Sequence, residues 1–287
     1  MHAMEPSCNM AWTVAAMGKW KREVIVMMLL LLISTTIAKE VRKAKGGRHR
    51  KRHSATGGQA IINGTSSNSS EAYCLSWRMA VEANNMRGWR TIPTECWRHV
   101  QGYMVGGQYY RDINLIIDQI YGYLDGVTPL GDGFDAWIFD VDDTCLSNLY
   151  YYRAKRFGCD PYNPTEFKTW ASKGESPAIP AVLDLFNKLI QVGFKVILLT
   201  GRDQETLGEA TVDNLLNQGF VGYERLIMRS PEYRGQSAVM YKSEIRRQIM
   251  EQGYRIWGNV GDQWSDLQGN FSGDRTFKFP NPMYFVP

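Results

Sequence analysis

Side chains that can bind a metal ion or a phosphate group follow three apolar runs in the second half of the chain. They are two pairs of aspartates and one threonine–glycine step: Asp140 with Asp142, Asp262 with Asp266, and Thr200 with Gly201. Carboxylates gathered in one place repel one another, and a cation relieves the repulsion. Mg²⁺ suits a site with few carboxylates and room for phosphate oxygens. The threonine hydroxyl and glycine N–H suit phosphate, so the pattern predicts magnesium-assisted chemistry on a phosphate group.

The apolar runs alternate with stretches of helical character. The runs are Ala136–Phe139, Phe194–Leu199, Arg225–Met228 and Arg255–Val260, with Thr276–Phe279 as a further strand. The helical stretches between them are Pro180–Gln191, Glu205–Asn217 and Ser243–Gln252, and Gly219 and Gly253 are expected to end the last two. Apolar strands separated by helices predict an α/β fold with a parallel sheet covered on both faces. Ligands bind beyond the carboxyl ends of such strands, so the polar residues should meet there.

Residues 71–130 have a different pattern, with large apolar side chains at spacings of three and four residues. This pattern predicts an N-terminal helical segment with helices over Ala72–Met86 and Val100–Leu124, separated by Gly88 and Pro93.

Four motifs in this order resemble those of the haloacid dehalogenase superfamily of phosphatases. They are DxDxT (Asp140, Asp142, Thr144), the turn Thr200-Gly201-Arg202, Lys242 in YKS, and GDxxxD (Asp262, Asp266). Longer stretches are similar to plant acid phosphatases and vegetative storage proteins of the class B acid phosphatase type: 73–85, 139–152, 193–202, 241–248, 258–267 and 277–287. The resemblance covers residues 72–287. It implies a three-layer Rossmann-like fold with a small cap insertion at about 148–178, and an acidic pH optimum.

The resemblance also implies a role for each motif residue. Asp140 would attack phosphorus and ligate Mg²⁺, while Asp142 would act as general acid and base and ligate the metal through its backbone carbonyl. Thr200, Gly201 and Lys242 would bind the phosphoryl oxygens.

In the last motif, Asp262 would be a further metal ligand, and Asp266 would orient a metal-bound water or Lys242. Arg202 has two interpretations, as a substrate-binding residue or as the partner of a surface acid. Asp143 and Asp203 are interpreted as turn formers or helix caps. The aromatic residues at 150–152 and Phe157 either line a substrate pocket or pack the insertion.

The substrate predicted in this way is a small phosphate ester. Two further interpretations keep the fold: a vegetative storage protein with little activity, and a phosphotransferase that uses the same intermediate. Storage proteins of this family can lack the nucleophilic aspartate, whereas this chain has Asp140. Oligomeric state stays open, a homo-oligomer included.

Residues 1–38 are predicted to be a targeting segment, and a linker is predicted to follow them. An apolar run at 24–38 follows Lys19, Lys21 and Arg22 and ends in small residues, which is typical of a cleaved signal peptide; an uncleaved anchor is the alternative. Residues 39–70 are basic, then rich in Gly, Ser and Asn, and are predicted to be a disordered linker before the domain at 71–287. If residues 24–38 were an anchor, the basic stretch would lie near anionic lipids.

The net charge of +4 arises in this N-terminal part. Residues 1–53 carry +8, so the rest of the chain sums to −4, which argues against a nucleic-acid-binding surface on the domain.

Sequons and cysteines indicate a secreted protein, extracellular or vacuolar. The sequons begin at Asn63, Asn68 and Asn270, and the first two lie where a polar loop is expected. Four cysteines follow the leader and allow three connectivities. A bond between Cys74 and Cys96 is favoured, with Cys145 as a buried free thiol.

Overall fold

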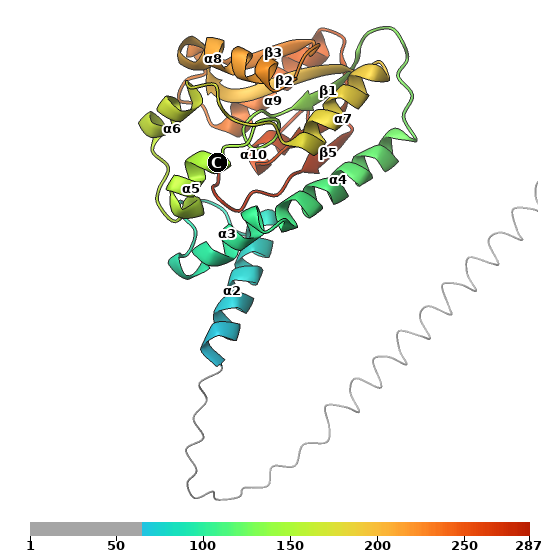
Figure 1. Ribbon diagram of the computed structural model, residues 1–287. Helices are drawn as coiled ribbons and strands as arrows, with labels where there is room; N and C mark the ends of the chain where they lie inside the picture. Colours follow the sequence, from blue (N-terminus) through green and yellow to red (C-terminus); the bar gives the residue numbers. More distant parts are fainter. Residues whose placement is uncertain (1–64) are drawn as a thin grey trace, which may run out of the picture. The chain divides into compact units, whose positions relative to one another are not determined.

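The computed structural model describes residues 65–287 (Figure 1). The predicted leader, the basic part of the linker and the sequon at Asn63 lie outside the described residues. Helix α2 (Thr65–Glu82) includes residues 65–70, so the prediction of a disordered linker is wrong there, and the Asn68 sequon lies in this helix and not in a loop. Across residues 65–287, no helix has both the length and the apolar character that crossing a membrane requires.

The described part of the chain contains a five-stranded parallel sheet in the order β3-β2-β1-β4-β5. The strands are β1 (Asp135–Phe139), β2 (Lys195–Asp203), β3 (Arg225–Arg229), β4 (Arg255–Gly261) and β5 (Arg275–Lys278). All five overlap the predicted runs, and the parallel α/β class is confirmed. Strand order reverses at the central strand β1, whose Phe139 pairs with Leu198 on one side and Val260 on the other. Ligands bind at such a switch point.

Helices cover both faces of the sheet, as the apolar strands predict (Figure 1). Trp137 and Phe139 of β1 point to the face that packs against α4 (Gln108–Leu124) and α7 (Pro180–Gln191). Ala136 and Ile138 point to the other face and pack against α9 (Ala238–Glu251), with α8 (Gln204–Asn217) following β2. Alternate side chains of this one buried strand therefore pack into two separate hydrophobic cores, one on each face of the sheet.

Two helix boundaries differ from prediction for local reasons. The expected helix Val100–Leu124 is broken into α3 (Trp97–Val105) and α4, since Gly107 adopts a left-handed backbone (φ 91°) between them. Helix α9 begins earlier than predicted because the Ser237 side chain accepts a hydrogen bond from the N–H of Met240 and caps it. The glycine ends at Gly219 and Gly253 are confirmed by their positive φ angles.

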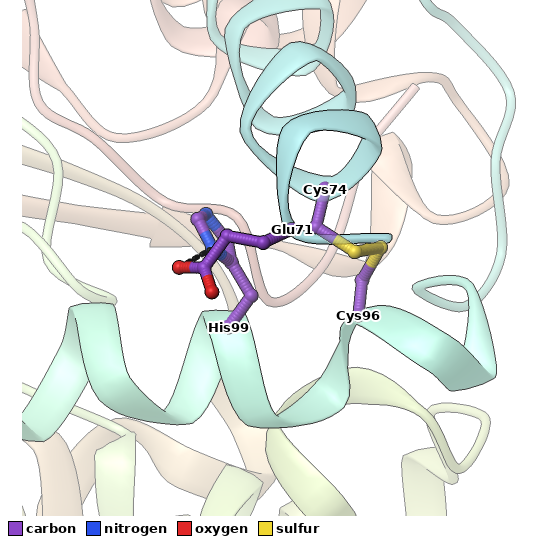
Figure 2. The surroundings of a disulfide bond; sticks show 4 residues. All are labelled: Glu71, Cys74, Cys96 and His99. Atoms are coloured by element: carbon purple, nitrogen blue, oxygen red, sulfur yellow. Dashed lines mark ion pairs between the residues drawn. A yellow bond between two sulfur atoms is a disulfide. The ribbon is translucent and has the colours of Figure 1, made fainter. Parts of the chain in front are cut away.

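A disulfide joins Cys74 on α2 to Cys96 at the end of the short helix η1 (Thr94–Cys96) (Figure 2). Close to it, His99 of α3 pairs with Glu71 of α2 at 3.9 Å. Cys145 is a free buried thiol, as predicted. The bond thus ties α2 to the rest of the helical segment.

Removing this disulfide by replacing Cys74 and Cys96 with alanine is expected to lower the free energy of unfolding by about 3 kcal/mol, because the bond closes a loop of 22 residues. The midpoint of thermal unfolding should fall by roughly 10 °C. Cys159→Ser, at a free cysteine, is the control. Equal midpoints for the double variant and the wild type would contradict a stabilising bond.

The insertion between β1 and β2 contains α5 (Leu149–Ala154), the short helix η2 (Arg156–Gly158) and α6 (Pro164–Ala171). Tyr151, Tyr152 and Phe157 are buried in it, whereas Tyr150 is exposed. The Tyr151 hydroxyl donates to the Asn163 carbonyl at 3.2 Å. Most of the aromatic cluster therefore packs the insertion, which is one of its two predicted roles.

Candidate functional site

The carboxyl ends of three adjacent strands bring the predicted polar residues together. Asp140 follows β1, Thr200 lies in the last part of β2, and Asp262 follows β4. All three are buried. The short helix α10 (Trp264–Leu267) then turns back and supplies Asp266, whose side chain accepts a hydrogen bond from the N–H of Gln263 at 2.9 Å.

Asp140, Asp262 and Asp266 form a buried acidic cluster in which one carboxylate oxygen of each lies within 4.8 Å of the others. Lys242 of α9 reaches into it, and its Nζ donates to Asp140 Oδ1 at 2.6 Å and to Asp266 Oδ1 at 2.7 Å. Three carboxylates and one ammonium leave two unbalanced negative charges. A divalent cation would balance them.

One buried carboxylate oxygen in this cluster is free to bind a cation. Asp262 Oδ1 is buried and has no hydrogen-bond partner among the described residues, although a buried carboxylate oxygen without a partner is costly. The Asp142 side chain is not a member of the cluster. This is consistent with the expectation that Asp142 contributes its backbone carbonyl and not its side chain.

Burial and mutual repulsion shift two of these carboxyl groups, Asp140 and Asp262, toward their neutral forms. Burial raises the pKa of Asp140 well above its ordinary value, with the Lys242 ammonium acting in the opposite direction. Burial, with Asp266 nearby, raises the pKa of Asp262 to about 8. The pKa of Lys242 is raised despite its burial, because Asp140 and Asp266 stabilise the ammonium.

These shifts predict that the metal-free protein loses stability as the pH rises. A carboxyl whose pKa is raised by folding binds more protons when folded than unfolded, so its contribution falls between the unfolded pKa and the folded one. With Asp262 titrating near 8, the thermal midpoint should fall by roughly 10 °C between about pH 5 and 8. Mg²⁺ should reduce the fall, and so should Asp262→Asn. A midpoint that rises over this interval in chelator would contradict the prediction.

Asp142 is held apart from the cluster by a bidentate ion pair with Arg202. The Arg202 Nε lies 3.1 Å from both carboxylate oxygens, and its Nη2 lies 2.8 Å from Oδ1. Asn148 Nδ2 donates to the same Oδ1 at 2.8 Å. Burial would raise the pKa of Asp142, but Arg202 and Asn148 lower it overall. Arg202 thus pairs with an acid, but the acid is the half-buried Asp142, a predicted catalytic residue, and not the surface acid that was expected as the alternative to substrate.

Thr200 and Gly201 lie next to this pair. The buried Thr200 Oγ1 accepts a hydrogen bond from the Arg202 N–H at 3.1 Å, whereas Gly201 is exposed. Asp203, at the end of the same strand, caps α8 by accepting from the N–H of Thr206, as predicted.

Asp143 does more than form a turn. It is buried with a positive φ of 53°, and it accepts hydrogen bonds from the Asn148 N–H and the Tyr284 hydroxyl, both at 2.9 Å. Burial raises its pKa to about 7. The run DVDDT places it beside the two predicted catalytic aspartates, but its partners come from the insertion and the C-terminus, which the motif alone could not reveal.

Two other buried residues near the site were not predicted. Arg246 donates to the carbonyls of Asp266 and Gln268, at 2.6 and 2.7 Å, and so fixes the end of α10. Asn281 donates to Asp262 from the C-terminal segment. The predicted sequon residue Asn270 is exposed.

The chain is similar to known proteins over most of its length. Residues 60–287 match the family described as HAD superfamily, subfamily IIIB (acid phosphatase). The chain is 46% identical to acid phosphatase 1 of Solanum lycopersicum, covering 75% of this chain and 84% of that protein. It is 37% identical to vegetative storage protein 1 of Arabidopsis thaliana, covering 75% and 79%.

Among solved structures, the class C acid phosphatase of Bacillus anthracis is similar in fold, with a TM-score of 0.51 and 22% identity over 65% of this chain and 83% of that one. The chain therefore belongs to the acid phosphatase family, subfamily IIIB of the haloacid dehalogenase superfamily.

Proposed function

We propose that the protein hydrolyses small phosphate monoesters through an aspartyl-phosphate on Asp140, with Mg²⁺ as cofactor. The observation that supports this most directly is the contact of Asp140 with Lys242 inside the buried acidic cluster. Asp140 lies at the end of the central strand, next to the Lys242 ammonium and the acidic cluster that would bind Mg²⁺. The two cations would balance the negative charge of a phosphate group that approaches Asp140.

In the first step, a carboxylate oxygen of Asp140 attacks phosphorus, an O–P bond forms, and the bond to the leaving alcohol breaks. Asp142 gives that alcohol a proton. In the second step, Asp142 takes a proton from water, which attacks phosphorus, and the bond to Asp140 breaks with release of inorganic phosphate. The ion pair with Arg202 favours the carboxylate form of Asp142, which the second step needs, and disfavours the protonated form, which the first step needs.

Three residues would bind the phosphoryl oxygens: Thr200, Gly201 and Lys242. Asp140, Asp262 and the backbone carbonyl of Asp142 would hold Mg²⁺, with Asp266 orienting Lys242, to which it is bonded at 2.7 Å. When bound, Mg²⁺ supplies positive charge that offsets the repulsion between the phosphate and Asp140.

The test is release of phosphate from an aryl phosphate by the purified protein, with Mg²⁺ and with a chelator. Rapid acid quench during turnover, followed by mass spectrometry of peptides, should find one phosphoryl group on the peptide that contains residue 140. A folded, Mg²⁺-loaded protein without turnover would overturn the proposal and favour the storage interpretation, which the similarity to a vegetative storage protein supports. Adding a small alcohol separates the hydrolase from a phosphotransferase, because transfer makes a new phosphate ester.

For its location, we infer passage through the secretory pathway to the cell exterior or vacuole. The apolar leader, the sequons at Asn63, Asn68 and Asn270, and the Cys74–Cys96 disulfide support this. Sensitivity of the natively expressed protein to an N-glycosidase, with the N-terminal residue of the mature chain, tests both glycosylation and leader cleavage.

A further inference from the structure

The C-terminal segment (residues 279–287) lies against the acidic cluster. It leaves β5 with the Phe279 N–H bonded to the Gly261 carbonyl at 2.8 Å, next to Asp262. Further along, it meets the insertion so closely that a Cβ on Gly158 would collide with the Met283 carbonyl. In Figure 1 the chain ends beside α5. The segment therefore has fixed contacts on both sides of the site.

Asp262 receives two amide donors on one oxygen and none on the other. Its Oδ2 accepts from Asn281 Nδ2 at 2.6 Å and from Gln263 Nε2 at 2.7 Å. Its Oδ1 is buried without a partner among the described residues. The two amides thus fix the rotation of the carboxylate and leave Oδ1 available to a cation.

The C-terminal segment also fixes the orientation of the Asn281 amide. Asn281 Oδ1 accepts from the N–H of Met283 at 2.9 Å, so the nitrogen must face Asp262. Pro280 and Pro282 flank Asn281 and restrict the backbone on both sides. With 3% of its surface exposed, the side chain has little freedom to turn away.

We propose that Asn281 is a positioning residue of the metal site, which sets the affinity for a divalent cation by holding Asp262 in its binding orientation. The proposal rests on the proposed function, since it takes Asp262 as a metal ligand. Hydrogen-bond donors behind a ligating carboxylate orient it before the cation arrives, and losing one typically weakens metal binding. The C-terminal segment thereby becomes part of the metal site.

The experiment measures Mg²⁺ binding to Asn281→Ala and to the wild type in two ways, by titration calorimetry and by the rise of the thermal midpoint with Mg²⁺ concentration. The expected result is a Kd raised by about 10- to 100-fold. At saturating Mg²⁺, kcat should return to within about threefold of the wild type, because the cation itself can then hold Asp262 in place.

Tyr284→Phe is the matched control in the same segment. It removes the bond to Asp143 but leaves Asn281 and Asp262 in place, so its Kd for Mg²⁺ should stay near that of the wild type. Asn281→Leu, which has a similar size and no donor for Asp262, supplies the Kd if the alanine variant does not fold.

An unchanged Kd in the Asn281 variants, with or without a lower stability, would show that the residue is only structural and would overturn the proposal. The proposal also fails if Tyr284→Phe weakens Mg²⁺ binding as much as Asn281→Ala does, because the effect would then belong to the whole segment. If the wild-type protein binds no Mg²⁺, this result would instead contradict the proposed function on which the inference rests.

Discussion

Asp140→Asn is expected to reduce phosphate release by on the order of 10⁴-fold or more, because the amide cannot take the place of the attacking carboxylate. The substitution preserves shape, so the buried site next to Lys242 should keep its packing. It also removes one of the carboxylates that crowd the cluster. We therefore expect a folded variant that lacks turnover, measured with an aryl phosphate at saturating Mg²⁺.

The control for this variant is Asp184→Asn, the same change on the exposed surface of α7, which should leave turnover unchanged. The acid-quenched Asp140→Asn protein should carry no phosphoryl group on the peptide around residue 140. Metal-dependent turnover that survives in this variant would assign the nucleophile to another residue.

The sequence predicted the sheet and the placement of the motifs well, because both depend on local patterns. The apolar runs fall on all five strands, and Pro180–Gln191 is helical over its full predicted range. Since parallel strands end at one edge, the pattern was enough to bring Asp140 and Asp262 together in space.

What the sequence could not predict are contacts between segments distant along the chain. The pairing of Arg202 with Asp142 spans 60 residues, and no spacing rule distinguishes it from contact with substrate. In the sequence, Asn281 is one residue of a proline-rich C-terminal segment. It reaches Asp262 because β5, which precedes this segment, pairs with β4, which precedes Asp262. Such side-chain partners follow from the packed fold and not from local propensity.

The predicted helix boundaries are wrong where the conformation of a single residue or a distant contact determines them. The break at Gly107 depends on a positive φ that the surrounding apolar periodicity conceals. The residues at 65–70 have a composition typical of linkers, yet they are part of α2, which the Cys74–Cys96 bond ties to the folded helices. Composition indicates the conformation that an isolated segment prefers, whereas tertiary contacts determine the conformation that it adopts in the folded protein.

Lys242→Met should have the second-largest effect, because it removes the positive charge that contacts two carboxylates of the site. We expect kcat/KM to fall by about 10²- to 10³-fold, as when one donor that stabilises transition-state charge is lost. Inhibition by inorganic phosphate should weaken as well. Lys188→Met, the same change at an exposed position of α7, is the control and should leave both quantities unchanged.

The same substitution should make the stability of the protein strongly dependent on Mg²⁺. Without the ammonium, Asp140 and Asp266 lose their shared partner, and breaking a buried ion pair costs about 3 to 5 kcal/mol. Since Lys242 holds the pKa of Asp140 down, its loss should raise that pKa further, so the metal-free variant should be most impaired at neutral pH. Mg²⁺ should restore much of the lost stability but not the turnover. If thermal unfolding in chelator at neutral pH were the same for variant and wild type, the ammonium would not be the partner that makes this acidic cluster compatible with burial.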